Sequence, residues 1–301
     1  MSNRKGALWK NLVRTTERAL RSGALVPVPT DFSFIEDGGM RFFVRILASL
    51  SRKDAAKEEQ NTAAKKGKSP NPFFPPEKEL VVSDISDTHL AILNKFNVVK
   101  HHLLIVTKHY EDQDTLLALN DFEALWFCMA EYKSLGFYNG GKDAGASQQH
   151  RHLQLVPLPL SPQGPAIPVE PLILNARRNS DSLIKIPGFE FLHSFMPLHK
   201  KLINSPYDAA RESFDIYKAM LAQVGMKGPE KAGLTLQSMP YNLLVAPEWM
   251  LLVPRSREFF EDVSFNSLAF AGSLFVRNEK QLKQIKFSRP MNALKSVTIP
   301  L

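Results

Sequence analysis

Residues 145–160, GASQQHRHLQLVPLPL, constrain this chain more than any other stretch. They begin with small and amide side chains, alternate through the middle, and end in an apolar segment interrupted by two prolines. This alternation predicts a strand that leaves its sheet at the prolines. Because side chains two residues apart on a strand share a face, we expect His150, His152 and Gln154 to form one polar face. The opposite face then carries Arg151, Leu153 and Leu155.

Two imidazoles and an amide on one face admit three interpretations. The face can simply contact water. Histidines at i and i+2 can also share a zinc ion, but the sequence has one cysteine and neither a Cys-x-x-Cys nor a His-Glu-x-x-His motif to complete the site. In the third interpretation, a neutral imidazole attacks phosphorus and forms a covalent phosphoramidate. The preceding turn would then offer backbone N–H groups and the Ser147 hydroxyl to phosphate oxygens.

The motif His-x-His-x-Gln after a Gly/Ser-rich turn resembles the nucleotide-transferring branch of the histidine-triad superfamily. That branch includes the galactose-1-phosphate uridylyltransferases and the diadenosine tetraphosphate phosphorylases, also called ATP adenylyltransferases. Residues 93–113, LNKFNVVKHHLLIVTKHYEDQ, and 265–282, FNSLAFAGSLFVRNEKQL, resemble the phosphorylases in particular. The likeness covers about residues 42–282. It departs at Arg277, where the family often has Lys, and at Ser273, where it often has Met.

The resemblance implies an α+β fold of the histidine-triad, galactose-1-phosphate uridylyltransferase-like type. Helices would pack on antiparallel sheet in two related halves. The half at 1–160 would carry the His-x-His-x-Gln strand, and the half at 161–301 would carry a degenerate repeat and a nucleotide-closing segment. A faint internal repeat agrees with this division: an aromatic-Asn pair, a short strand, a turn and a strand ending in a basic residue occur at 96–108 and again at 241–255.

The implied activity is phosphorolysis of diadenosine tetraphosphate to ATP and ADP, reversible as adenylyl transfer. A dinucleoside polyphosphate hydrolase and a sugar-1-phosphate uridylyltransferase remain alternatives within the superfamily. A nucleotide- or RNA-binding protein with a decayed site is an alternative of another class, although the intact His150, His152 and Gln154 argue against decay. The chemistry requires no cofactor, and Mg²⁺ can accompany the polyphosphate.

The resemblance also assigns roles to single residues. His152 would attack the α-phosphorus and carry AMP, His150 would orient the site, and Gln154 would hold a phosphate oxygen. Arg277 would neutralise distal phosphates. The implied substrate-binding residues are Lys53, Asn94, Lys95, Asn139, Gly145, Ala146, Ser147, Gln148, Asn266, Ser267, Leu268, Ser273 and Arg277.

A formal net charge of +8 suits a polyanionic ligand. The basic residues are scattered rather than arranged in a stripe with aromatics, which favours nucleotides and phosphate over nucleic acid as partners. No apolar run is long enough to cross a membrane, and the first residues lack the apolar core of a secretory signal. With a single cysteine, Cys128, the expected location is the cytoplasm.

Local patterns predict the remaining elements. Helical spacing of apolar residues indicates helices at 8–22, 115–135 and 208–224. Strands are expected at 80–83, 90–94, 97–108 (with a turn at 100–102) and 189–197, and a surface excursion at the proline-rich 161–187. Residues 54–69 are charged and Ala-rich without apolar periodicity, which predicts a mobile solvated loop bordered by Lys53.

Overall fold

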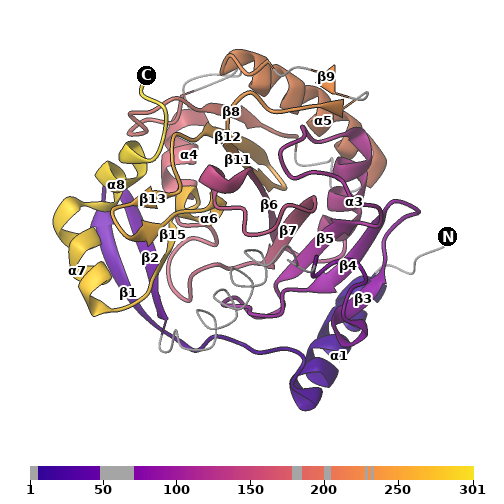
Figure 1. The fold of residues 1–301 in the computed structure, drawn as a ribbon. Coiled ribbons are helices and arrows are strands. Elements are labelled where there is room, and N and C mark those ends of the chain that lie inside the picture. Colours follow the sequence, from indigo (N-terminus) through magenta and orange to yellow (C-terminus); the bar gives the residue numbers. More distant parts are fainter. Residues whose placement is uncertain (1–5, 48–70, 178–184, 200–204, 228–229, 232–233) are drawn as a thin grey trace, which may run out of the picture.

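The computed structural model describes residues 6–47, 71–177, 185–199, 205–227, 230–231 and 234–301 (Figure 1). The expected α+β architecture is confirmed, because helices pack on a large antiparallel sheet. Its eight strands run in the order β3-β4-β5-β7-β6-β11-β12-β8, and every neighbouring pair is antiparallel. In that order the strands are Val81–Asp84, His89–Leu93, Leu103–Thr107, His152–Pro157, Ser134–Gly140, Tyr241–Ala246, Trp249–Pro254 and Ser194–Pro197.

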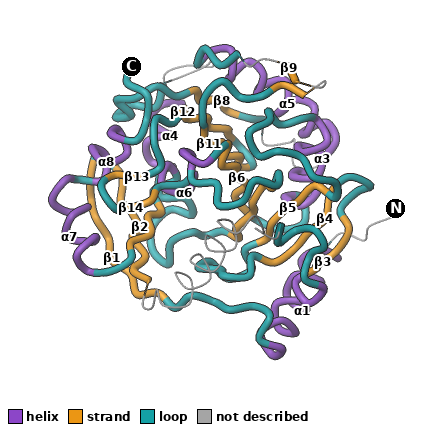
Figure 2. The backbone as a smooth tube through the Cα atoms, in the orientation of Figure 1, coloured by secondary structure: helices purple, strands orange, loops and turns teal. Residues whose placement is uncertain are grey.

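Both parts of the chain contribute to this sheet. The first five strands come from residues 81–157, and the last three come from residues beyond 190. They meet where β6 pairs with β11, with Asn139 opposite Asn242. The strand that carries His152 therefore lies one place from the junction (Figure 1), and Figure 2 draws the strands of this sheet in orange.

The large sheet is covered on both faces. Against one face pack α1 (Ala7–Ser22), α3 (Leu119–Met129) and α5 (Pro206–Gln223), with Leu153 and Leu155 in the same core. Against the other lies a three-stranded sheet of β1 (Thr30–Asp37), β2 (Met40–Leu47) and β15 (Ser273–Val276), in which β2 and β15 are parallel. The helices on this side are α4 (Glu170–Arg177), α6 (Ser267–Phe270), α7 (Glu279–Ser288) and α8 (Pro290–Ser296).

Short elements complete the described chain. The 3-10 helices are Lys78–Leu80 (η1) and Lys142–Ala144 (η2). Two-residue strands pair as β9 (Glu230–Lys231) with β10 (Leu234–Thr235) and as β13 (Phe259–Phe260) with β14 (Val263–Ser264). In the described ranges, we find no helix with the length and hydropathy needed to cross a bilayer.

The first and third expected helices are confirmed. Helix α1 buries Leu8, Leu12 and Ala19 at helical spacing, and Gly23 ends it with a φ of 76°. A left-handed residue after the last turn suits glycine, which has no Cβ to clash. The expected helix at 208–224 corresponds to α5.

The expected helix at 115–135 is wrong at both ends. Helix α3 begins at Leu119, after a bend that the Asp121 carboxylate stabilises by accepting from the Ala118 N–H at 2.7 Å. Residues 134–140 form strand β6, which is buried throughout and paired on both edges. Pairing with two neighbours outweighs local helix preference there. Gly136 does not stop a helix; its missing side chain lets Leu125 approach, since a Cβ would lie 2.7 Å from Leu125 Cδ1.

Other expectations also need correction. Residues 161–187 are no surface excursion in their described part, because Ile167, Val169 and Ile173 are buried in the core beside α4. In the segment 97–108 the expected turn at 100–102 is present and β5 follows it, but residues 97–99 form no strand and lie in the connection from β4. The strand expected at 189–197 is confined to β8. The loop predicted at 54–69 lies outside the described residues, as does Lys53.

Candidate active site

The expected division of side chains is confirmed within strand β7, for His152 and Gln154, whereas His150 lies before the strand and does not share their cavity face. His152 and Gln154 line a cavity of about 460 Å³ on one side of the sheet. Leu153 and Leu155 are buried in the helix-covered core on the other side. Arg151 also points away from the cavity, toward α3. Alternation along one strand thus separates the polar face from its apolar support.

His152 is held as a neutral base. Its Nδ1 lies 2.9 Å from the carbonyl oxygen of His150. Because a carbonyl only accepts, Nδ1 carries the proton and donates it, which leaves the lone pair on Nε2. Burial lowers the pKa of His152 to about 4, since the charged imidazolium is poorly solvated there. At neutral pH, His152 therefore presents an uncharged nucleophilic nitrogen in the cavity wall.

His150 does not line the cavity. Its Nε2 donates to the Thr107 carbonyl at 2.8 Å, and its Nδ1 accepts from the Asn71 amide at 2.8 Å. Burial lowers the pKa of His150, so this neutral tautomer persists. Asn71 also accepts the Phe73 N–H at 3.0 Å, and the Phe73 ring lies 5.3 Å from the His152 ring between centroids. His150 thus holds the His152 ring through its carbonyl oxygen and is itself fixed from both ring nitrogens.

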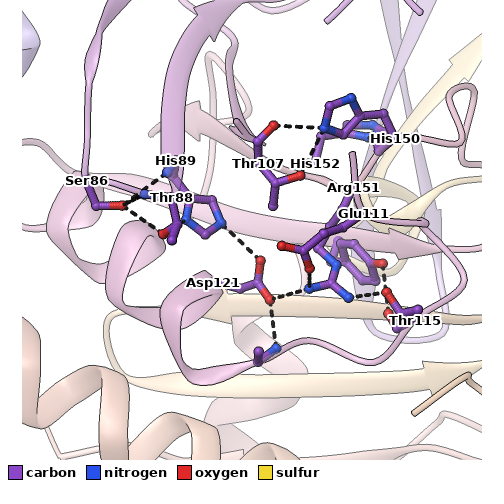
Figure 3. A network of polar contacts seen from close by, with 12 residues as sticks. Ser86, Thr88, His89, Thr107, Glu111, Thr115, Asp121, His150, Arg151 and His152 are labelled. Atoms are coloured by element: carbon purple, nitrogen blue, oxygen red, sulfur yellow. Dashed lines mark hydrogen bonds and ion pairs between the residues drawn. The ribbon is translucent and has the colours of Figure 1, made fainter. Parts of the chain in front are cut away.

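A buried charged network holds the back of this strand (Figure 3). The Arg151 guanidinium, 1% exposed, pairs with Asp121 at 3.2 Å and with Glu111. The other Asp121 oxygen lies 3.1 Å from Nε2 of His89. A buried cation needs paired carboxylates to offset its lost hydration, and these come from α3 and the segment before it. The network therefore anchors the residue between the two histidines.

The cavity brings together most of the predicted substrate-binding residues. It lies between the large sheet and the small one, since Phe137 and Gln154 come from the former and Leu47 and Phe275 from the latter. The predicted residues that line it are His152, Gln154, Asn94, Lys95, Asn139, Gly145, Ser147, Gln148, Asn266, Leu268 and Arg277. Arg277 is exposed at the end of β15, where its position allows it to reach an anionic ligand.

Besides His150, three described residues of the predicted substrate-binding set do not line the cavity. Ser273 is buried, and its hydroxyl accepts from Arg45 at 2.8 Å. Ser267 is buried, and its hydroxyl donates to the Asn139 side chain at 2.6 Å. Ala146 lies in the turn beside Gly145 without lining the cavity. Ser267 and Ser273 therefore hold neighbouring side chains, those of Asn139 and Arg45.

The orientation of the Asn139 amide is fixed by three donors. Its Oδ1 accepts from the Ser267 N–H at 3.0 Å, from the Ser267 hydroxyl, and from the Asn242 amide at 3.0 Å. The amide nitrogen is therefore directed to the cavity that Asn139 lines. Asn242 is held in turn by Arg255, which donates to its Oδ1 at 2.5 Å. Residues beyond 240 thus set a donor in the candidate site.

Sequence reasoning missed several cavity residues. Phe73, Glu77, His102, Phe137, Glu258 and Gln281 line it as well. Lys95 donates to Glu77 at 2.7 Å, so this lysine enters the cavity wall as one partner of an ion pair. No local pattern marks such residues, because they come together from distant segments.

The zinc interpretation finds no ligand cluster in the part of the chain that the structure describes. No group of three or more His, Cys, Asp or Glu side chains there could hold a metal ion. Both ring nitrogens of His150 are already engaged by protein groups. Cys128 is a buried free thiol whose pKa is raised by burial, so it offers no reactive thiolate.

Two family models match nearly the whole chain. The Ap4A phosphorylase N-terminal domain matches residues 1–175, and the ATP adenylyltransferase C-terminal domain matches residues 187–300. Among curated proteins, the chain is 25% identical to diadenosine 5',5'''-P1,P4-tetraphosphate phosphorylase 2 of Saccharomyces cerevisiae over 269 residues, covering 81% of this chain and 79% of the relative.

Solved structures agree on the fold. A crystal structure of a yeast Ap4A phosphorylase is similar with a TM-score of 0.77 at 21% identity, covering 97% of this chain and 94% of that one. The structure of the yeast enzyme in complex with Ap4A is similar with a TM-score of 0.71 at 21% identity, covering 97% of each chain. At this level of identity, the matches establish the antiparallel architecture and the placing of its strands.

Proposed function

Because the chain belongs to the Ap4A phosphorylase family, we propose that it splits diadenosine tetraphosphate (Ap4A) with phosphate into ATP and ADP through an AMP-histidine intermediate. The observation that carries this proposal is the neutral imidazole of His152. Its Nδ1 is committed to a carbonyl, which leaves Nε2 as a nucleophile in the cavity wall. The first half, 1–160, supplies this nucleophile. The second half, 161–301, closes the cavity.

In the first step, Nε2 of His152 attacks the α-phosphorus of Ap4A. A nitrogen–phosphorus bond forms, and the bond from phosphorus to the bridging oxygen breaks, so that ATP leaves. The imidazole becomes positively charged while its Nδ1 proton stays on the nitrogen. The His150 carbonyl, 2.9 Å from Nδ1, stabilises that charge as it develops.

In the second step, an oxygen of inorganic phosphate attacks the same phosphorus. The nitrogen–phosphorus bond breaks, ADP leaves, and His152 returns to its neutral form with the lone pair on Nε2. The two steps require no external acid and no oxidant or reductant. The same two steps in reverse transfer AMP from ADP to ATP.

Donors around the cavity meet the charge on the phosphate oxygens. The Gln154 amide lies two residues beyond His152 on the same face, and the Asn139 amide nitrogen is directed to the cavity from the neighbouring strand. Ser147, Gln148 and the N–H groups of their turn come from the segment before the strand. Arg277 and Lys95 add positive charge for the distal phosphates.

Neutral groups at the reacting centre suit transfer to phosphate. A glutamine holds a phosphate oxygen without titrating near neutral pH, so it gives water no acid–base assistance. Inorganic phosphate is already an anionic nucleophile and needs less help. The proposed partners are nucleotides and phosphate, and the proposed setting is the cytoplasm, where Cys128 stays a free thiol.

The test is to trap the intermediate. Protein is incubated without phosphate with Ap4A labelled at the α-phosphorus, so that ATP leaves and AMP stays on the protein, and the histidine carrying acid-labile label is identified by mass spectrometry. His152→Ala should keep its fold and bind AMP but lose label and more than about 99% of turnover. His193→Asn is the matched control, since its Nδ1 also donates to the carbonyl two residues earlier, at 2.8 Å, outside the cavity. It should be labelled normally.

Each contrary result has a distinct meaning. Label on His150 would reverse the roles of the two imidazoles. Full turnover by His152→Ala would exclude covalent catalysis. Abundant AMP from the unmutated protein without phosphate would make the enzyme a hydrolase.

A further inference from the structure

Strands β6 and β7 separate at the nucleophile. Their antiparallel ladder runs from Ser134 opposite Pro157 to Phe137 opposite Gln154 and ends there. By the same register, Asn139 would face His152 as the next hydrogen-bonded pair. Both strands continue past that point, because β6 stays paired with β11 through Gly140 and β7 stays paired with β5 through His152. The ladder therefore forks, with each branch held by its outer neighbour.

The Gln113 side chain fills the fork. Its Oε1 accepts from the His152 N–H at 2.9 Å, and its Nε2 donates to the Asn139 carbonyl at 2.8 Å and the His152 carbonyl at 3.3 Å. A carboxamide has the same donor and acceptor as a peptide group. Here it makes hydrogen bonds with backbone N–H and C=O groups that would otherwise bond to the opposite strand. Gln113 is 2% exposed, so water is a poor substitute.

The backbone of Gln113 is anchored on both sides of the site. Its N–H donates to the Gln149 carbonyl at 2.7 Å, in the turn that leads into the His-x-His strand. Its own carbonyl accepts from the Tyr138 hydroxyl at 2.5 Å, beside Asn139 on β6. Gln113 therefore has a fixed position relative to both strands of the fork, β6 and β7.

We propose that Gln113 is a positioning residue for the transfer step, because its side-chain amide sets the distance between the nucleophile His152 and the donor Asn139. It touches the main chain of both residues and does not line the cavity. If β6 and β7 stayed paired up to this point, Asn139 and His152 would lie directly opposite each other as a hydrogen-bonded pair. The space between them for the reacting phosphate would then be narrower. This inference rests on the proposed function, since it assigns the amide a part in that reaction.

Two variants separate positioning from folding. Gln113→Met keeps the length of the side chain and removes both hydrogen-bonding groups. Gln113→Glu keeps an acceptor for the His152 N–H and loses the donor to the two carbonyls. Turnover of Ap4A with phosphate, the rate of adenylylation by labelled Ap4A without phosphate, AMP binding by calorimetry, and unfolding are measured for each.

We expect kcat and the adenylylation rate to fall roughly 100-fold in both variants while the Kd for AMP changes less than about 3-fold, since small misplacements of a nucleophile cost this much. Ser213→Ala is the control for stability loss. It removes the buried hydroxyl that accepts from the Trp126 indole at 2.7 Å, in the helix layer. It should lower stability and leave kcat unchanged.

Normal kcat and adenylylation in either Gln113 variant, from a preparation whose unmutated protein is active, would overturn this inference alone. Loss of AMP binding in parallel with kcat in both folded variants would also overturn it, because Gln113 would then serve binding. If the unmutated protein forms no adenylyl-histidine, the proposed function fails and this inference fails with it.

Discussion

Mild acid should destabilise this fold through His152. Burial lowers the pKa of the folded imidazole to about 4, whereas the imidazole of the unfolded chain has its ordinary value of 6.5. Between these values the unfolded state binds more protons, so stability is full above pH 6.5 and is lost as pH falls toward 4. The shift corresponds to about 3 kcal/mol in all, of which about 2 kcal/mol is lost by pH 5.

The assay isolates this contribution with His152→Asn, which does not titrate in the window. Urea unfolding of both proteins is measured at about pH 7.5 and about pH 5. The unmutated protein should lose about 2 kcal/mol more than the variant between the two conditions. Subtraction cancels the other groups, including His150 and His193, whose pKa values are also lowered by burial.

A matched histidine tests whether acid sensitivity follows burial or chemistry. His193→Asn should also reduce the loss of stability at pH 5, because that imidazole is buried and neutral too. Its turnover should stay normal. The difference in free energy of unfolding between His152→Asn and the unmutated protein is the quantity to compare. If that difference is the same at both pH values, His152 is not held neutral by burial, and the argument for Nε2 as the nucleophile fails.

Two further substitutions test the cavity. Gln154→His should slow discharge to phosphate and raise the share of AMP among the products, because an imidazole can assist water; nucleotide chromatography measures both, and an unchanged product ratio would contradict the role of the amide. Gly145→Ala should raise KM about 10-fold and lower stability by about 1–3 kcal/mol, because φ is +90° and a Cβ would lie 3.0 Å from the Phe265 carbonyl oxygen. Gly164→Ala is its control, since φ is +87° with open space around it. Gly164→Ala should lower stability and leave KM unchanged. Equal KM values for the two variants would refute the proposed contact between Gly145 and the substrate.

The strand that carries His152 and Gln154 was predictable because its signal is local. Alternation at 150–155 fixes which side chains share a face, and the structure bears this out for His152 and Gln154. The segment at 115–135 was not predictable in the same way. Its apolar residues fit a helical stripe, and only pairing with strands from residues 152–157 and 241–246 decides that residues 134–140 are extended.

The contacts that position the site residues cannot be recognised from a local sequence pattern. Gln113 binds main-chain atoms 26 and 39 residues away, and such contacts need only one amide without any repeat or spacing. The cavity is closed because β15 pairs with β2, which brings Ser273 to Arg45 across 228 residues. A pattern within one window cannot contain either relation. These parts of the site follow from topology.

The side-chain oxygen of Asn139, which accepts three hydrogen bonds, has a consequence for how the sequences of related chains diverge. Its partners Ser267 and Asn242 belong to the other half, and Arg255 fixes Asn242 from behind. A change at any one of the four removes at least one of these buried hydrogen bonds, at a cost of about 0.5–1.5 kcal/mol. These positions should therefore be inherited and replaced as a set. A hybrid that joins the first half of one relative to the second half of another will work best when both parents share all four.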